Sequence, residues 1–404
     1  MKRSLSWLMS LFIILALAGC ASSPQPGLTA PASSASPQPG APAAQAALTL
    51  SVINVGKADA LLLSTPDGAH YMVDTGKAED YPQLAQALAV HGVTRLEGVI
   101  LTHGHKDHMG GLPSLLQALP VDTLYVNALD TVTYKSGQIE ALLEGRQTQL
   151  KKLRVGDTLQ LGGAQATVLA PTGVDEENEN NNSLVLMVQY GQTRMLLMGD
   201  AEENVEKLLL ASQQNLNAQV LKAGHHGKDD ATTEAFLQAV APEHVILTGD
   251  PAEDSESPGK RVVALLEQGT ADYIQTIGDV LTYDYTSDGQ RFTPGQTPAL
   301  QDSSPLAGLE LDGIDRKAEY VRVKNNSSQA LNLTGCWILS ENGGETYFFP
   351  QGTSLAPGGT LTIVSGDEPP QGDLTWTTDK VWKAKKGDAA LLYDAQGRLL
   401  DRLD

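Results

Sequence analysis

Downstream of residue 47, short apolar runs alternate with turn residues and with longer segments of helical periodicity. Residues 98–102 form an apolar run of strand length, and residues 81–90 place Leu84, Ala87 and Leu88 on one helix face. Strands interleaved with helices predict a layered α/β domain over residues 47–295, with sheets inside and helices outside. The same criteria predict further strands at 48–55, 58–64, 71–73, 123–126, 158–161, 166–170, 183–189, 194–198, 218–222, 244–247 and 272–275, and further helices at 112–119, 201–212, 232–240 and 261–268.

A polar, proline-containing linker at 296–306 precedes a different pattern. Residues 307–404 contain only short alternating runs separated by turns, which predicts a small all-β sandwich. Trp337 and Trp382 are predicted to lie in its core. Because such linkers are crossed by few contacts, we expect this domain to be dispensable for chemistry in the first one. Strands are predicted at 320–324, 337–340, 347–349, 360–364 and 389–393.

The N-terminus has the pattern of an export signal. Lys2 and Arg3 precede an apolar run at 7–18, which ends in Leu-Ala-Gly-Cys with the cysteine at Cys20. This resembles the lipobox of bacterial lipoproteins, which implies a signal peptide at 1–19 and lipidation of Cys20. Residues 20–46 are rich in proline, alanine and serine, as expected of a tether. We therefore expect an exported protein held on the outer face of the bacterial cytoplasmic membrane by the lipid alone; the alternative is an ordinary signal peptide with an incidental cysteine.

Composition and charge narrow the function classes. The chain has 404 residues, of which 41% are hydrophobic and 19% charged, so a buried core and two or three domains are expected. The net charge is −20, and residues 47–304 carry −18. This excludes a basic protein that follows nucleic-acid phosphates over its whole surface, but not a nucleic acid bound at a metal site. Two cysteines, Cys20 and Cys336, exclude a disulfide scaffold and a cysteine-ligated zinc site.

One motif carries the chemistry. The predicted strand at 98–102 runs directly into residues 103–108, His-Gly-His-Lys-Asp-His. Imidazole and carboxylate groups are ligands for zinc-like ions, and a strand end followed by a tight loop lets alternate side chains converge. His103 and His105 can face one ion, and Asp107 and His108 a second one. The alternative is a histidine cluster on a surface loop.

Further motifs over residues 48–295 resemble those of the metallo-β-lactamase superfamily. The resemblance is strongest to the branch that contains the extracellular hydrolase domain of the competence protein ComEC, and it implies an αββα sandwich. Residues 55–60 (VGKADA) resemble the branch's VGQGDA motif, and residues 73–76 its Asp-x-Gly turn. Asn182 and Ser183, followed by residues 196–200 (LLMGD), resemble its NxxS…LLTGD stretch, and residues 224–227 (GHHG) its GHHGS motif.

This resemblance implies two divalent metal ions, zinc or manganese, with Asp200 bridging them. Either His225 or His226 would complete the second site, and the other would face the substrate as a hydrogen-bond donor or proton shuttle. For Asp200 the alternative is a cap for the following helix, and for Asp59 and Asp74 it is a plain turn role. The implied metal ligands are His103, His105, Asp107, His108, Asp200 and His225; the catalytic residues are Asp107, His225 and His226; and the residues that orient the ligands from behind are Asp59, Asp74 and Asn182.

Departures from the family patterns refine this hypothesis. The loop at 177–183 has no histidine, whereas superfamily members usually place a third histidine for the first metal there. The ComEC-like branch shares this absence, which argues against antibiotic hydrolysis. Ser257 stands where the branch has the histidine of a His-Pro pair, Lys57 and Ala58 replace glutamine and glycine, and Lys228 replaces serine.

The C-terminal domain resembles the lamin-tail domain, an immunoglobulin-like sandwich. Residues 319–325 (EYVRVKN) resemble its EYVEIxN opening, and residues 333–339 (LTGCWIL) its LxGWxL strand with Cys336 inserted. We expect an accessory module that binds an anionic polymer or a protein. A local basic patch, which is otherwise a solvated loop, consists of Lys380, Lys383, Lys385 and Lys386.

Three functions follow as hypotheses. The first is a binuclear, metal-dependent phosphodiesterase acting on extracellular DNA, as the resemblance implies. The second keeps the metal site but acts on cell-wall or teichoic-acid phosphodiesters, because a net charge of −18 on the first domain disfavours long DNA. The third is a surface-binding lipoprotein with weakened catalysis.

Overall fold

The computed structural model describes residues 47–129, 138–300 and 304–404. The expected signal peptide, Cys20 and the tether lie outside the described residues and stay predictions. Within the described ranges, no helix is both long and apolar enough to cross a membrane.

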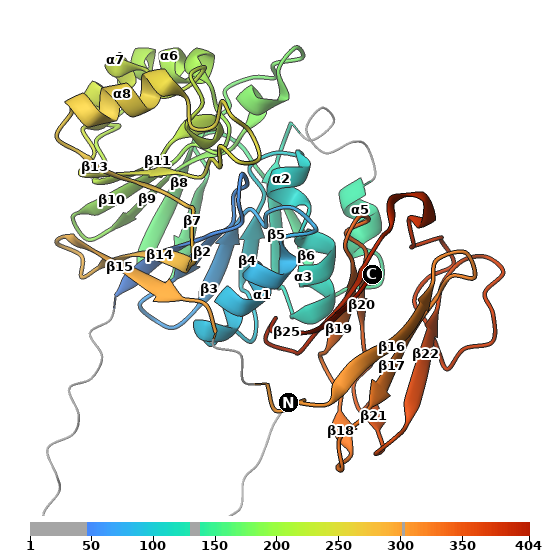
Figure 1. Cartoon of the computed structure of the whole chain (residues 1–404). Coiled ribbons are helices and arrows are strands. Elements are labelled where there is room, and N and C mark those ends of the chain that lie inside the picture. Colours follow the sequence, from blue (N-terminus) through green and yellow to red (C-terminus); the bar gives the residue numbers. More distant parts are fainter. Residues whose placement is uncertain (1–46, 130–137, 301–303) are drawn as a thin grey trace, which may run out of the picture. The chain divides into compact units, whose positions relative to one another are not determined.

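The first domain is built on two sheets, as Figure 1 shows. β1 pairs with antiparallel neighbours on both sides, whereas β3 to β6 run parallel to one another. The parallel strands bring their C-terminal ends to one edge of the sheet. In spatial order this sheet contains β15 (Phe292–Pro298), β14 (Val280–Ser287), β1 (Leu48–Ile53), β2 (Leu61–Ser64), β3 (His70–Val73), β4 (Gly98–Ile100), β5 (Thr123–Asn127) and β6 (Gln149–Leu153).

The second sheet contributes another parallel edge. Its strands β10 to β13 are parallel, and β7 to β10 are antiparallel. In spatial order it contains β13 (Asp272–Gln275), β12 (His244–Leu247), β11 (Val220–Lys222), β10 (Thr193–Leu197), β9 (Val185–Tyr190), β8 (Ala164–Ala170) and β7 (Thr158–Leu161).

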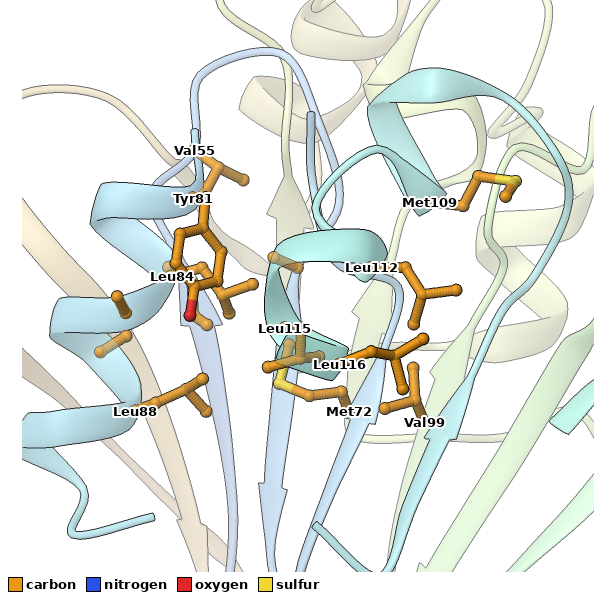
Figure 2. Close-up of a cluster of buried hydrophobic side chains, with 14 of the residues drawn as sticks. Val55, Met72, Tyr81, Leu84, Leu88, Val99, Met109, Leu112, Leu115 and Leu116 are labelled. Carbon is orange, nitrogen blue, oxygen red and sulfur yellow. The ribbon is translucent and has the colours of Figure 1, made fainter. Parts of the chain in front are cut away.

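Apolar side chains fill the spaces between four layers. Leu50 and Leu61 of the first sheet pack with Leu186 and Met195 of the second. Helices α1 (Tyr81–Val90) and α3 (Leu112–Ala118) pack on the outer face of the first sheet, where Figure 2 shows Leu84 and Leu115 near Met72. Helices α6 (Glu203–Ala211), α7 (Glu234–Val240) and α8 (Lys260–Gln268) cover the second sheet. The predicted αββα sandwich is therefore confirmed.

Several elements were not predicted. β6 is largely polar, helix α5 (Gln138–Leu143) has only six residues, and β14 is a mostly buried strand next to β1. β15 pairs with β14 as far as Pro298, so the predicted linker at 296–306 begins inside a strand. The reason is that β15 is an exposed edge strand, whose polar sequence resembles a linker.

Residues 309–403 form the predicted β-sandwich. Its core includes Ile338, Leu392, Cys336 and Trp382, which confirms the interior position of Trp382. One of its two larger sheets contains, in spatial order, β16 (Leu309–Asp315), β17 (Tyr320–Asn325), β22 (Thr360–Val364) and β23 (Leu374–Thr375). The other contains β20 (Thr346–Phe348), β19 (Trp337–Ser340), β24 (Ala390–Tyr393) and β25 (Leu399–Leu403). A small third sheet pairs β18 (Leu331–Asn332) with β21 (Ser354–Leu355).

Trp337 belongs to a different cluster than predicted. It stacks on Tyr393 with ring centroids 4.1 Å apart and meets the edge of Tyr81 of α1 at 5.2 Å. Ser114 of α3 donates a hydrogen bond to Thr346 over 3.0 Å. One hydrophobic cluster thus joins the first domain to the sandwich, and the expectation that few contacts cross the linker is wrong.

Candidate metal centre

The candidate site lies where strands of both sheets end. β4 leads into residues 101–105 and the short helix α2 (Lys106–Met109), β10 leads to Asp200, and β11 leads to the turn η2 (Gly224–Gly227). The sequence predicted a loop at 103–108. Instead, α2 begins at Lys106 and carries Asp107 and His108 on one turn.

A first cluster contains His103, His105 and Asp200, whose ligand atoms all lie within 4.8 Å of one another. His103 Nε2 is 3.0 Å from His105 Nδ1 and 3.9 Å from Asp200 Oδ2. His105 Nε2 also lies 3.3 Å from a carboxylate oxygen of Glu179, in the loop where the superfamily histidine is absent. His103, His105 and Asp200 are thus the ligands expected around one ion, and the carboxylate of Glu179 lies beside His105.

A second cluster shares Asp200 with the first. His108 Nε2 and His226 Nε2 lie 3.2 Å and 3.4 Å from Asp200 Oδ2. Asp107 Oδ2 lies 3.4 Å from His226 Nε2. His103, His108 and His226 are completely buried, so the alternative of a surface histidine cluster is wrong for these residues. The alternative of Asp200 as a helix cap is also wrong, because α6 begins at Glu203 and its cap is Glu202.

Two carboxylates stand behind the second cluster. Asp74 Oδ2 is 2.8 Å from His108 Nδ1, and Asp59 Oδ1 is 3.2 Å from His226 Nδ1. A carboxylate on Nδ1 fixes the ring and leaves Nε2 for a metal. Asp74 also accepts hydrogen bonds from the backbone N–H and hydroxyl of Thr102, at 2.8 Å and 2.7 Å. Asp59 and Asp74 thus contact the Nδ1 atoms of two candidate ligands, and a plain turn role does not account for these contacts.

Asn182 occupies a different position from the one implied. Its side chain bonds the backbone of Asp175 in both directions at 2.8 Å and does not bond the histidines. The next residue, Ser183, does reach the site: its Oγ lies 3.3 Å from His103 Nδ1 and accepts a hydrogen bond from Asp200 N over 3.0 Å. Asn182 therefore shapes the loop, and Ser183 holds two candidate ligands.

The structure separates the two adjacent histidines. His226 joins the second cluster, whereas His225 lies with Glu202 and Asp230 in a third group. The resemblance implied His225 as a ligand of the second ion, but the structure places His226 there instead. Both histidines have left-handed backbones, with φ of 44° and 55°. Such strain in non-glycine residues persists where the surroundings fix it, typically at functional sites.

Buried negative charge dominates the electrostatics. Burial alone would lower the pKa of His226, but Asp200 and Asp59 raise it to about 9. Burial also lowers the pKa of His108, but Asp200 and Asp74 outweigh this effect. The pKa of His108 therefore lies well above its usual value. Lys222, buried in β11, places its Nζ 2.5 Å from Asp59 Oδ2. The second cluster therefore attracts positive charge.

The residues present fit a pair of divalent ions. Within the described ranges, His108 Nε2, His226 Nε2 and Asp200 Oδ1 are buried and lack a hydrogen-bond partner. Buried polar atoms without a partner are rare and costly, and a metal would satisfy all three. His103, His105 and Asp200 would hold one ion, and His108, Asp200 and His226 the other. Asp59 lies within reach of this second set, and Asp107 Oδ2 lies 3.4 Å from His226 Nε2.

Sequence reasoning missed several residues that hold this site. Thr102 Oγ1 lies 3.1 Å from His103 Nδ1, and Thr248 Oγ1 lies 3.1 Å from His226 Nδ1. Lys222 offered a signal, because it is a charged residue at the end of an apolar strand. The threonines offered none, since a hydroxyl beside a strand end is common.

Comparison with known proteins identifies both domains. Residues 53–248 match the family model of the metallo-beta-lactamase superfamily, and residues 302–404 match that of the lamin tail domain. The chain carries a metallo-beta-lactamase domain followed by a lamin tail domain. Both resemblances drawn from the sequence motifs are thereby confirmed.

Curated relatives of the metallo-beta-lactamase domain include a protein of the ComE operon and one named a competence protein. The chain is 27% identical over 242 residues to ComE operon protein 3 of Bacillus subtilis (strain 168), covering 56% of this chain and 31% of the relative. It is 29% identical over 223 residues to Competence protein ComA of Neisseria gonorrhoeae, covering 55% and 29%. The chain thus spans less than a third of the length of these relatives.

Solved structures with a similar fold are more distant in sequence. The metallo-beta-lactamase fold protein YhfI from Bacillus subtilis has a TM-score of 0.42 and 13% identity, covering 60% of this chain and all of YhfI. A diphosphatase from the PhnP family has a TM-score of 0.37 and 14% identity, covering 59% of this chain and 98% of that protein.

Proposed function

We propose that this metal-binding hydrolase is a phosphodiesterase that cleaves extracellular DNA. The observation that carries the proposal is the pair of histidine and aspartate clusters sharing Asp200, with buried donors that lack partners. Ions held by these residues would supply positive charge to the oxygens of a phosphodiester. DNA as the polymer follows from the resemblance of the motifs to the ComEC-like branch, and one relative is named a competence protein.

The chain's own residues divide the work. When bound, two divalent ions supply positive charge to the phosphoryl oxygens and lower the pKa of a nearby water. Asp59 and Asp74 orient His226 and His108 for that pair. His225 is half-buried beside the cluster, and we assign it contact with the substrate.

The surroundings of His225 suit this role. Its Nδ1 lies 3.0 Å from both oxygens of Asp230 and 3.4 Å from Glu202 Oε1, so the ring is held by carboxylates on one side. Its Nε2 is directed toward Asn180, at 3.4 Å. With its Nδ1–H held by carboxylates, the neutral ring accepts at Nε2, and the imidazolium form can donate from Nε2 where charge develops in the transition state.

The two histidines can be distinguished by paired variants. His225→Gln should keep the bound metal and lower kcat by about 10²-fold, because a donor to the reacting group is lost. His226→Gln should lose metal as well as activity. Metal analysis and steady-state kinetics on the same preparations measure both effects; loss of metal from His225→Gln would contradict the assignment.

An envelope phosphodiester is the second candidate substrate. The net charge of −18 on residues 47–304 repels long polyanions, and the expected lipid at Cys20 would hold the enzyme at the cell surface. In either case we propose that the lamin tail domain binds an anionic polymer or a protein. The third candidate is a surface-binding lipoprotein with weakened catalysis. It does not explain why two clusters of metal-binding side chains share Asp200.

Activity should be tested with the full-length protein and added Mn²⁺ or Zn²⁺. Bis-p-nitrophenyl phosphate reports phosphodiester chemistry, and a DNA strand and a polyglycerol phosphate compete to identify the polymer. Asp200→Asn should abolish turnover, whereas Asp288→Asn, in an exposed turn, should not. Absence of turnover with either metal would contradict the proposed phosphodiesterase activity. Stronger competition by polyglycerol phosphate than by DNA would show that the substrate is an envelope polymer.

A further inference from the structure

Three lysines lie in loops that also carry residues of the metal centre. Lys57 follows β1, Lys77 follows β3, and Lys228 follows η2. We call them the basic rim. Their side chains are 18%, 12% and 20% exposed, so they are sheltered but accessible. Lys77 Nζ also lies 3.7 Å from Asp80 Oδ2 of its own loop.

Two rim lysines are paired with one segment, residues 250–257, which we call the acidic loop. Lys228 Nζ lies 2.7 Å from Asp254 Oδ2, and Lys77 Nζ forms an ion pair with Glu253. The third, Lys57, lies 2.7 Å from Asp107 Oδ2, a candidate metal ligand. The rim therefore extends from the metal centre to the acidic loop.

The acidic loop is anchored beside His226 at both ends. Just before it, Thr248 contacts the His226 ring, and at its end the Ser257 hydroxyl donates a 3.5 Å hydrogen bond to the His226 carbonyl. Between these anchors, Glu253 lies directly over Gly56: a Cβ on Gly56 would be 2.0 Å from Glu253 Oε1. Glu253 is thus held against the loop that carries Lys57 and Asp59.

We propose that the basic rim is a subsite for the phosphates of a nucleic-acid strand next to the scissile group, and that Glu253 and Asp254 occupy it in the free protein. The inference rests on the proposed function and names the part of the site that recognises the polymer. Lysine forms charge-assisted hydrogen bonds with carboxylates and with phosphates alike, so incoming phosphates replace the adjacent Glu253 and Asp254 on the lysines. Lys57, next to Asp107, faces the phosphate nearest to the metals.

Binding without catalysis tests this subsite. Full-length protein in EDTA is titrated into a fluorescein-labelled oligothymidylate of about six nucleotides, and anisotropy is read at several salt concentrations. Lys77→Gln with Lys228→Gln should weaken binding about fivefold or more and reduce the salt slope by about 1.4. The matched control is Lys151→Gln on β6 with Lys207→Gln on α6, which removes the same charge elsewhere. It should change the binding affinity by about 1.5-fold at most.

The acidic loop gives a variant with the opposite sign. Glu253→Gln with Asp254→Asn should tighten binding by about fivefold or more, because the internal competitors are neutralised. Equal effects of rim and control lysines, or no tightening in the acidic-loop variant, would overturn the proposal. Equal competition by polyglycerol phosphate would overturn its assignment to nucleic acid. Failure of the proposed phosphodiesterase would instead appear as absent bis-p-nitrophenyl phosphate turnover with metal, while these binding differences remained.

Discussion

At the residue scale, the site depends on which ring nitrogen each histidine presents. Asp74 and Asp59 contact the Nδ1 atoms of His108 and His226, and both Nε2 atoms then face Asp200. The histidines would otherwise be free to adopt either tautomer. Carboxylates two contacts away from a metal thus decide whether the donors converge.

Asp74→Asn tests this positioning directly. The amide can no longer fix the His108 tautomer by charge, so metal affinity should fall about 10- to 100-fold. Competition with a fluorescent chelator measures the affinity. Asp67→Asn, in an exposed turn of the same domain, should leave affinity unchanged. An Asp74→Asn protein with the affinity of the parent would show that the carboxylate is not needed for orientation.

The raised pKa of His226 predicts a pH dependence of the metal-free protein. The pKa rises from 6.5 to about 9 in the fold, so the stabilisation is complete below pH 6.5 and is lost as pH rises to 9. The loss at the site should be on the order of 3 kcal/mol in the free energy of unfolding. Denaturation with EDTA present measures it, and bound metal should remove the effect because it replaces the proton. A flat profile in EDTA would contradict the coupling.

At the element scale, the sequence predicted the strands whose ends carry candidate ligands. It missed features that depend on strand pairing and on local packing. Apolar periodicity located β4 and β10, and their C-terminal ends carry His103 and Asp200. It could not predict β15, because edge strands need no apolar face. Nor could it distinguish His225 from His226, because the choice depends on two left-handed residues set by the packing of η2.

The η2 turn packs closely enough to be tested by one methyl group. A Cβ on Gly224 would lie 2.2 Å from the Ala201 carbonyl oxygen, whereas one on Gly173 would meet nothing within 4 Å. Gly224→Ala should therefore cost about 1–3 kcal/mol of stability and displace His226 and Asp200 together, lowering metal content. Thermal unfolding and metal analysis measure both. Gly173→Ala is the control, and a Gly224→Ala protein with full metal content would contradict the close packing.

At the scale of the whole molecule, the lamin tail domain contributes to the core of its neighbour. Trp337 and Tyr393 complete a cluster that contains Tyr81 and Leu84 of α1. Every candidate ligand still lies before residue 227. The sandwich is therefore expected to affect stability of the metallo-beta-lactamase domain while leaving the ligands in place.

Trp337→Ala should lower the free energy of unfolding by about 3–5 kcal/mol, as expected for a large buried side chain. Metal content at low temperature should stay the same. Trp376→Ala is the comparison: Trp376 is half-buried and packs within the sandwich against Trp382, so its loss should spare the metallo-beta-lactamase domain. Hydrogen exchange of α1 distinguishes them. Unchanged protection of α1 in Trp337→Ala would show that the shared cluster does not support that helix.

The central claim is a centre for two ions that share Asp200, and metal stoichiometry tests it most directly. Elemental analysis of the full-length protein after reconstitution with Mn²⁺ or Zn²⁺ should give about two ions per chain. His103→Ala with His105→Ala should keep about one, since the second cluster retains its own histidines. The account would be contradicted if the parent protein bound no metal. It would also be contradicted if the parent bound one ion per chain and the double variant bound none.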